Sequence, residues 1–272
     1  LPYCGMSTAG AVSVPIRVED FNAVKSFTLI YKYYPTAITY SGSSSNPIFN
    51  SQNGLLTIAD GSAAGGMRKI TLTFNGLNTI SLPDNAILAT INFNYIGGET
   101  VLEWRTDASF YYGPGNVQKC NTPTSDYLIN GGVISNLAPI TKIDSAIALE
   151  GNLATLTVRT WDFDDIRSGV LNLNYDDDVL TFSEALPNAA IADSFAVDAT
   201  APGNLELSFF DADTSLADGS VLMYVTFQYI GGSSPLTWFD DGASCQYFHC
   251  HLEDPMTDSP QTTYYLNGNI SS

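Results

Sequence analysis

Residues 14–40 read VPIRVEDFNAVKSFTLIYKYYPTAITY, and residues 156–182 read LTVRTWDFDDIRSGVLNLNYDDDVLTF. In both stretches an Asp-Phe pair follows the first segment, and a Ser, a Leu and a Tyr recur at the same spacing after it. Self-similarity over so long a distance indicates that one structural unit has been duplicated within the chain. The repeat therefore predicts two domains of one fold.

The match between the two halves resumes downstream. The paired residues there are Leu72-Thr73-Phe74 with Leu207-Ser208-Phe209, Leu82-Pro83-Asp84 with Leu216-Ala217-Asp218, Tyr95-Ile96-Gly97-Gly98 with Tyr229-Ile230-Gly231-Gly232, Trp104 with Trp238, and Asn130-Gly131 with Asn267-Gly268. The chain of 272 residues has room for two domains of the usual size, about 100–150 residues each. We place them at residues 1–137 and 138–272, joined by a short connection without the Gly and Ser runs of a flexible linker.

Within each half the apolar residues alternate with polar ones. Residues 153–158 (LATLTV), 170–175 (VLNLNY) and 221–227 (VLMYVTF) follow this period of two, which is typical of strands with one buried face. Gly, Pro, Asn and Asp bound these short segments, and no long stretch has helical periodicity. The pattern predicts an all-β fold with two tandem sandwich domains of about nine strands each.

The charge balance excludes some classes of partner. Lys and Arg number 10 against 28 Asp and Glu, so the formal net charge is -18. Binding to nucleic acid and to anionic membranes depends on basic side chains, and we expect neither partner. No run of apolar residues reaches the length of a membrane span, and residues 1–5 lack the features of a signal peptide. We interpret the chain as an extracellular or cell-surface protein without membrane insertion.

Four cysteines are an even number, as expected for a secreted protein with disulfides. Cys4 precedes the first predicted strand of the first half, and Cys120 lies shortly before its last strand. Cys245 and Cys250 lie close together in the second half. We predict two disulfides, Cys4 with Cys120 and Cys245 with Cys250.

The order of the segments resembles the cohesin domain and its carbohydrate-binding-module relatives. The likeness rests on residues 158–163, on residues 173–182 and on the stretch LSFFDADTSLADGSVLMYVTF at 207–227, where an acidic turn and an Asp-Gly step lead into a buried strand. The first half departs from this pattern, with Asp84-Asn85 in place of Asp218-Gly219. The resemblance implies a nine-stranded jelly roll in each half. It also implies a role in binding a protein, in assembly or in binding polysaccharide, but it carries over no contact residue.

Two segments are candidate metal sites, and no other cofactor is expected. His249 and His251 lie in one short segment with two cysteines, and imidazole with thiolate suits zinc. The alternative there is a looped disulfide with two exposed histidines. Asp211, Asp213 and Asp218 offer the oxygen ligands that calcium prefers. The alternative is turn formation, which Asp favours by bonding to its own backbone.

No catalytic motif is present in the sequence: it has no Gly-x-Ser-x-Gly elbow, no phosphate-binding loop and no His-Glu-x-x-His. We therefore predict that the protein is not an enzyme. Sugar-binding faces use exposed aromatic rings, and Tyr111, Tyr112, Tyr264 and Tyr265 are the candidates for such rings.

These observations favour a non-catalytic scaffold, adhesion or assembly module of a cell surface. It would act by binding a protein partner or by self-assembly into a fibre or layer. The alternative is a carbohydrate-binding module that recognises a polysaccharide through exposed aromatic residues.

Overall fold

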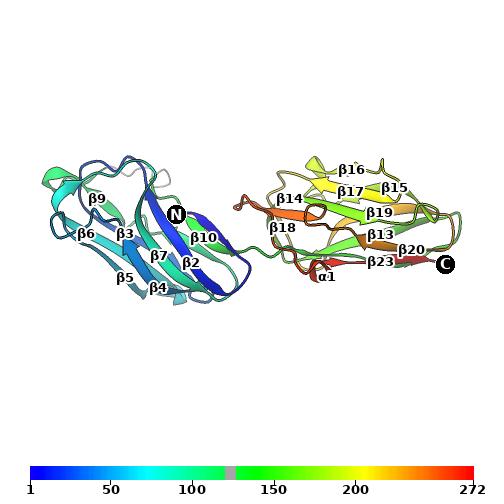
Figure 1. The fold of residues 1–272 in the computed structure, drawn as a ribbon, viewed down its shortest axis with the longest axis horizontal. Coiled ribbons are helices and arrows are strands. Elements are labelled where there is room, and N and C mark those ends of the chain that lie inside the picture. The colour runs from blue at the N-terminus through cyan, green and yellow to red at the C-terminus, as the bar shows by residue number, and fades with distance from the viewer. Residues whose placement is uncertain (120–126) are drawn as a thin grey trace. The chain divides into compact units, whose positions relative to one another are not determined.

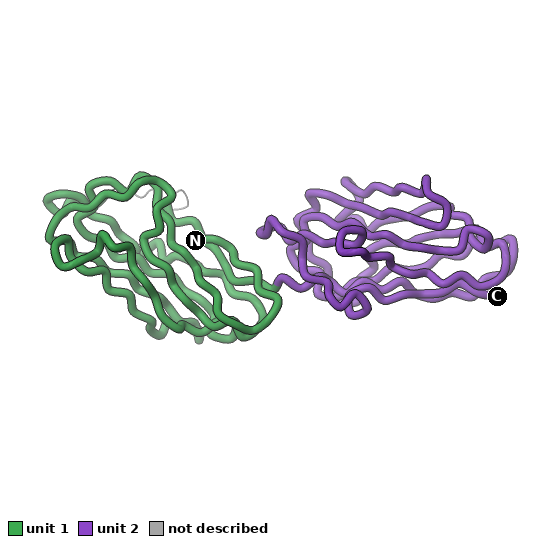
Figure 2. Tube along the Cα trace, in the orientation of Figure 1, with its two compact units in different colours: residues 1–135 green, residues 136–272 purple. Residues whose placement is uncertain are grey.

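The computed structural model describes residues 1–119 and 127–272 and divides the chain into two compact units, Leu1–Ser135 and Asn136–Ser272 (Figure 2). Both units are built from strands (Figure 1). None of the described residues forms a helix long and apolar enough to cross a membrane.

Unit 1 has two sheets. Its larger sheet has the order β1-β10-β8-β3-β6-β5, with β9 paired to β3, and its smaller sheet has the order β2-β7-β4. The bounds of its strands are β1 Tyr3–Met6, β2 Gly10–Val18, β3 Val24–Tyr33, β4 Ile38–Ser45, β5 Leu56–Ser62, β6 Arg68–Ile80, β7 Ala86–Tyr95, β8 Thr100–Trp104, β9 Phe110–Tyr112 and β10 Gly131–Ser135.

Unit 2 repeats this arrangement. Its larger sheet has the order β12-β23-β20-β14-β17-β16, with β18 and β21 paired to β14, and its second sheet has the order β15-β19-β13-β11-β22. The bounds of its elements are β11 Ile140–Ile143, β12 Ala146–Ile147, β13 Leu153–Trp161, β14 Phe163–Asn174, β15 Leu180–Pro187, β16 Ala196–Asp198, β17 Asn204–Phe209, β18 Thr214–Leu216, β19 Ser220–Tyr229, β20 Ser233–Trp238, β21 Gln246–His249, α1 Gln261–Tyr264, β22 Tyr265–Leu266 and β23 Gly268–Ser271.

The predicted all-β, jelly-roll fold is confirmed, with a finer division of strands than the nine expected in each half. Unit 2 splits its first strand into β11 and β12 and its last into β22 and β23, because each piece pairs within a different sheet. The additional short strands β9 and β21 pair with β3 and β14.

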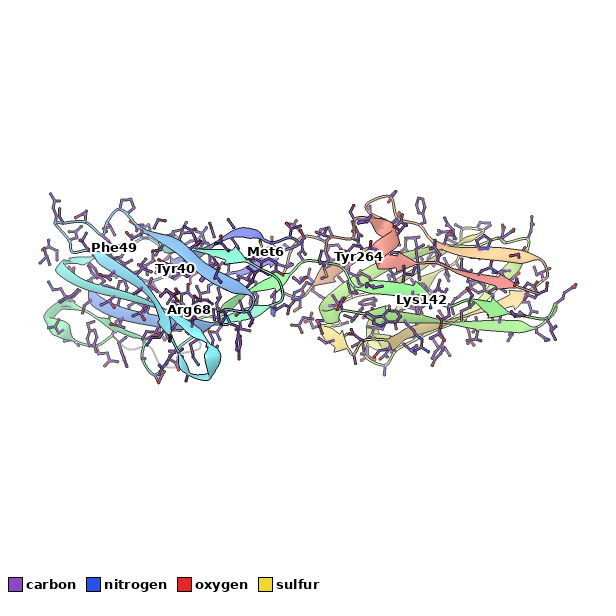
Figure 3. All side chains as sticks on the ribbon, turned by 90° about the horizontal axis from the view of Figure 1, so that it is seen from below. Met6, Tyr40, Phe49, Arg68, Lys142 and Tyr264 are labelled. Atoms are coloured by element: carbon purple, nitrogen blue, oxygen red, sulfur yellow. The ribbon has the colours of Figure 1, made fainter. Side chains whose placement is uncertain are left out.

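Each unit has its own core between its sheets, and the side chains that fill it are drawn in Figure 3. Tyr31 and Tyr33 of β3 and Phe93 of β7 are fully buried in unit 1. In unit 2, Phe163 and Phe227 are also fully buried. Burial of one such side chain stabilises the folded state by about 1.5–3 kcal/mol, so the alternating apolar residues account for the two layers.

Residues repeated between the halves make the same contacts. Asp84 accepts a hydrogen bond from the backbone N–H of Asp20 at 2.8 Å, and Asp218 accepts one from that of Asp162 at 3.0 Å. Asp20 and Asp162 have φ angles of 50° and 55°, a left-handed conformation that Asp tolerates better than most residues. The repeated acids are therefore explained by this turn.

The repeated Trp and Asn-Gly residues form a second shared contact. The backbone N–H of Trp238 donates to the side-chain oxygen of Asn267 at 2.9 Å, and the backbone N–H of Trp104 donates to Asn130 at the same distance. The glycine that follows is required by close packing: a Cβ on Gly268 would lie 2.4 Å from the carbonyl oxygen of Asp144.

Candidate functional site

In unit 2, β11 covers the edge of β13. The two strands are antiparallel, with Ile140 opposite Trp161 and Ile143 opposite Val158. Thr141 and Ile143 are fully buried, and the Thr141 hydroxyl lies 2.6 Å from the hydroxyl of Tyr247 on β21. Strand β11 thus satisfies the backbone groups of β13 and fills the core with alternate side chains.

In unit 1 the equivalent edge belongs to β2. Strand β2 aligns with β13 residue by residue, and both carry a register shift at the same place, between Ile16 and Arg17 and between Val158 and Arg159. Among the residues that the structure describes, β2 pairs with β7 and with no other strand. Unpaired backbone groups at a sheet edge are free to accept another strand.

The glycine contacts show which residues of unit 1 correspond to the end of β11. A Cβ on Gly131 would lie 2.2 Å from the carbonyl oxygen of Pro2 and 2.7 Å from that of Leu1. A Cβ on the equivalent Gly268 would lie 2.4 Å from the carbonyl oxygen of Asp144 and 2.9 Å from that of Ile143. Pro2 therefore occupies the place of Asp144, and Leu1 that of Ile143.

A cavity of about 490 Å³ lies at this place, which we call the β2 groove. Its lining includes residues 15–20 of β2 and the turn after it, Leu1 and Pro2, Trp104, Leu128 and Tyr111. Ile16, Val18 and Leu128 belong to the buried core, so the floor of the groove is apolar. Arg17 and Glu19 are exposed at its rim.

Two titratable groups in the groove are affected by burial. Burial lowers the pKa of the Leu1 amino group, which donates to the carbonyl oxygen of Ile129 at 2.9 Å. Burial also raises the pKa of Tyr111 well above its ordinary value. The position of Tyr111 opposite Phe27 matches that of Tyr247 opposite Gly169, so Tyr111 is the counterpart of the tyrosine that bonds to Thr141.

A second site lies in unit 2, where Asp165, His249 and Cys250 come together. One ligand atom from each lies within 4.8 Å of the other two, and no other group of three or more His, Cys, Asp or Glu meets this limit within residues 1–119 and 127–272. Cys250 Sγ lies 3.9 Å from His249 Nδ1, and the backbone N–H of Cys250 donates to the carbonyl oxygen of Asp165 at 2.8 Å. We call these three residues the Asp165 cluster.

The histidine of this cluster is buried, with 1% of its surface exposed. Burial lowers the pKa of His249, against the opposing effect of Asp165. Its Nδ1 accepts a hydrogen bond from the backbone N–H of His251 at 3.1 Å, and its Nε2 has no hydrogen-bond partner among the described groups. His251 itself is exposed, beyond the end of β21, so the two predicted metal-binding histidines do not share one environment.

The predicted bridge between Cys245 and Cys250 is wrong, because both are free thiols. Strand β21 separates them, and five residue steps of extended chain span roughly 16 Å, far beyond the Cα separation of a disulfide. The Cys245 thiol is buried and lies 3.2 Å from the carbonyl oxygen of Phe239. The other predicted bridge involves Cys120, which lies outside the described residues; Cys4 lies on β1.

The three acids of the predicted calcium site lie in a turn region. Asp211 and Asp213 are exposed and have φ angles of 51° and 40°, and Asp218 is engaged in the turn with Asp162. They do not form a group of three ligands within the described part of the chain. Calcium binding here stays a prediction, and turn formation explains the positions of these acids.

The predicted aromatic surface is divided between the units. Tyr264 and Tyr265 are 9% and 3% exposed, and the Tyr265 hydroxyl donates to Asp258 at 3.1 Å, so the prediction that they offer a face to a sugar is wrong. Tyr111 and Tyr112 are half-buried on β9, with the Tyr111 ring 5.9 Å from that of Phe27. The apolar side chains of these segments face the core. That a residue is aromatic does not by itself show whether its ring is buried or exposed.

Neither a protein-family model nor a curated protein sequence matches the chain. Solved structures do match it. A cohesin from Clostridium acetobutylicum is 19% identical over 50% of this chain and 92% of that chain, with a TM-score of 0.41. The sixth cohesin of scaffoldin B from Acetivibrio cellulolyticus, solved with a dockerin, is 14% identical over 49% and 98%, with a TM-score of 0.42. A non-cellulosomal cohesin from the archaeon Archaeoglobus fulgidus is 20% identical over 49% and 89%, with a TM-score of 0.40.

Each of these three cohesins matches about half of this chain. At such identities the likeness concerns the fold and gives no residue of the β2 groove or of the Asp165 cluster a role. Asp165 has a weak signal in the sequence, as one of three acids in the segment WDFDD. The groove has none, because the pairing of strands is not visible in a single sequence.

Proposed function

We propose that this protein is a non-catalytic, extracellular assembly module whose unit 1 binds an extended segment of a partner protein. The partner segment adds to the free edge of β2 and completes the sheet, as β11 completes the sheet of unit 2. The observation that carries the proposal is the apolar groove along β2, a strand that pairs only with β7 among the described residues.

The energetics of strand addition suit this groove. A partner strand would pair its backbone with that of β2, which gives affinity, and its alternate side chains would enter the groove, which gives specificity. In unit 2 the side chains at these alternate positions, such as Thr141, are fully buried. Burial of one medium-sized apolar side chain contributes about 1.5–3 kcal/mol, so a few residues suffice for specific binding.

Strand β11 also defines what the partner segment should be. It should run antiparallel to β2, with a small side chain at the position of Thr141 and half-exposed side chains at the positions of Ile140 and Lys142. A hydroxyl at the Thr141 position would face Tyr111, as Thr141 faces Tyr247. The strong negative charge of the chain supports solubility in an extracellular setting and favours a neutral or basic partner segment.

The direct test uses a peptide copied from unit 2. A labelled peptide with the sequence of residues 136–142, NLAPITK, ends where Leu1 begins in the matched register. We expect saturable binding to the whole chain at one peptide per chain, measured by fluorescence anisotropy. A peptide of the same composition in scrambled order is the control.

A matched variant identifies the groove. Tyr111→Phe keeps the ring but removes the hydroxyl, and we expect it to weaken binding about fivefold, equivalent to one hydrogen bond of about 1 kcal/mol. Tyr112→Phe on the same strand should have no effect. Replacing the peptide threonine by valine should also weaken binding, and the two losses should not add, because both remove the same hydrogen bond. Equal binding of the native and scrambled peptides, or no binding of either, would contradict the proposal.

The same preparation should be examined by light scattering. Ordered oligomers of the chain alone would identify the partner as a second copy. A monomer that binds the peptide would point to a different protein as the partner.

A further inference from the structure

We propose that the Asp165 cluster is a zinc site, formed by a carboxylate, an imidazole and a thiolate. It lies in unit 2, apart from the β2 groove, and is independent of the proposed function. The donor set is one that zinc prefers, since thiolate and imidazole favour zinc over the harder calcium and magnesium ions.

The geometry of the cluster is close to that of a bound state. Zinc binds sulfur at about 2.3 Å and nitrogen or oxygen at about 2.0–2.2 Å, so tetrahedral ligand atoms lie roughly 3.3–3.8 Å apart. The distance from Cys250 Sγ to His249 Nδ1 is 3.9 Å, and all three ligand atoms lie within 4.8 Å of one another. Asp165 and Cys250 are not fully buried, so small side-chain rotations can close the remaining gap.

The histidine presents one ring nitrogen to the other two ligands. His249 is 1% exposed, and the atom that lies 3.9 Å from Cys250 Sγ is its Nδ1. This atom accepts a hydrogen bond from the backbone N–H of His251. Binding of zinc at Nδ1 would replace the bond from the His251 N–H, which lies in an exposed turn where water can accept it.

Unit 1 has the same backbone hydrogen bond at this place but lacks the three ligand side chains. The backbone N–H of Asp165 donates to Ser215 at 2.8 Å, and that of Ala23 donates to Ser81 at 2.9 Å, in the same left-handed conformation. The strand register places Gly113 and Pro114 at the positions of His249 and Cys250. All three ligand side chains are therefore present in unit 2 and absent from its duplicate, which is expected if they serve a purpose other than the fold.

Binding involves no change of oxidation state. The S–H bond of Cys250 breaks, the zinc–sulfur bond forms, and the proton passes to solvent. Aspartate and the neutral imidazole each supply one further bond, and the fourth position of the tetrahedron is left for water. The separation of Cys250 from Cys245 by β21 keeps this thiol available.

The test uses the reduced, metal-free whole chain. We expect it to bind one zinc ion in competition with a chromogenic chelator, and to give a thiolate-to-cobalt charge-transfer band when cobalt is the probe. Cys250→Ser should abolish the band and weaken zinc binding at least tenfold, and Asp165→Asn should weaken zinc binding about tenfold and retain the band. Cys4→Ser and Glu206→Gln are the matched controls. Zinc binding or a cobalt band that survives Cys250→Ser unchanged would overturn the assignment.

A second measurement needs no variant. Zinc should slow the alkylation of Cys250 in the wild-type chain, followed by mass spectrometry, and leave the rate at Cys4 unchanged. Equal alkylation rates at Cys250 with and without zinc would also overturn the assignment.

Discussion

At the residue scale, the amino acids that recur in the two halves are those that hold turns and close contacts. Asp84 and Asp218 each accept a hydrogen bond from the backbone N–H of an aspartate in a turn. Asn130 and Asn267 each accept one from the backbone N–H of a tryptophan. These roles need one side-chain type at one position. The residues that repeat are therefore those that the backbone of the fold requires, and they do not indicate a ligand site.

The first prediction concerns the glycine beside β11. Gly268→Ala should destabilise unit 2 by about 1–3 kcal/mol, because its Cβ would meet backbone atoms that cannot move aside. Gly10→Ala is the matched control, since a Cβ there meets nothing within 4 Å. Denaturant unfolding followed by tryptophan fluorescence measures both. A loss no larger than that of the control would contradict the close packing described for Gly268.

The second prediction concerns the acid that the sequence pointed to as a calcium ligand. Asp218→Ala should destabilise unit 2 by about 1 kcal/mol through the lost hydrogen bond to Asp162, and Asp218→Asn should lose less because the amide oxygen still accepts. Glu206→Gln controls for the change in charge. Unfolding curves should show these losses equally with and without a calcium chelator. Loss of stability on chelation in wild type, abolished by Asp218→Ala, would instead support a calcium site.

Residue-level predictions from the sequence failed where they depended on the direction of a side chain. Cys245 and Cys250 are near in sequence but stand at opposite ends of a strand. Tyr265 is aromatic and close to a chain end, yet it lies in the core. Direction within a strand is set by pairing with distant residues, which a single sequence does not display.

At the element scale, the strands of each sandwich could be predicted from the alternation of apolar residues, and their pairing could not. The alternation located β13 and β19, but it does not show which segment pairs with the edge of a strand such as β13, which β11 covers. The β2 groove depends on strand pairing in the same way. It became visible because the fold occurs twice.

The third prediction concerns three polar groups shared by β3, β5 and β6. Tyr33 donates to Asp60 at 2.9 Å, and Arg68 also bonds to Asp60. Burial raises the pKa of Tyr33 to about 12, with Asp60 contributing. Because the folded-state pKa lies above the ordinary value of about 10, the stability that depends on the neutral phenol is present below pH 10 and is lost as the pH rises to about 12.

This prediction is checked by alkaline unfolding. Tyr33→Phe should make the stability of unit 1 less sensitive to pH between about 10 and 12, while lowering it by about 1 kcal/mol at neutral pH. Tyr34→Phe, which alters an exposed neighbour, is the control. An unchanged alkaline slope in Tyr33→Phe would show that the phenol does not ionise in this range on unfolding.

At the scale of the whole molecule, the duplication accounts for most of what the sequence predicted. The expected boundary after residue 137 and the observed division after Ser135 lie in one short segment. The two units share a fold and differ at their sites, since unit 1 has the open groove and unit 2 has the Asp165 cluster.

The fourth prediction follows from this difference. A variant with the sequence of residues 139–142, PITK, placed directly before Leu1 should fill the β2 groove from within the chain. It should raise the thermal midpoint of unit 1, leave that of unit 2 unchanged, and prevent binding of the NLAPITK peptide. The NLAPITK peptide at 100 times its dissociation constant should stabilise the wild-type unit 1 by about 2.7 kcal/mol. One calorimetric series can then compare the stabilisation by the added peptide with that by the PITK extension. If the PITK variant still binds the peptide as wild type does, the groove is not the binding site.

The most direct test of the open edge is hydrogen exchange at two equivalent amides, measured residue by residue by NMR. The backbone N–H of Arg159 faces Lys142 of β11, and that of Arg17 faces the groove. We predict slow exchange at Arg159, fast exchange at Arg17 in the free chain, and slow exchange at Arg17 once the NLAPITK peptide is added. Slow exchange at Arg17 in the free chain, or fast exchange that the peptide leaves unchanged, would contradict the account.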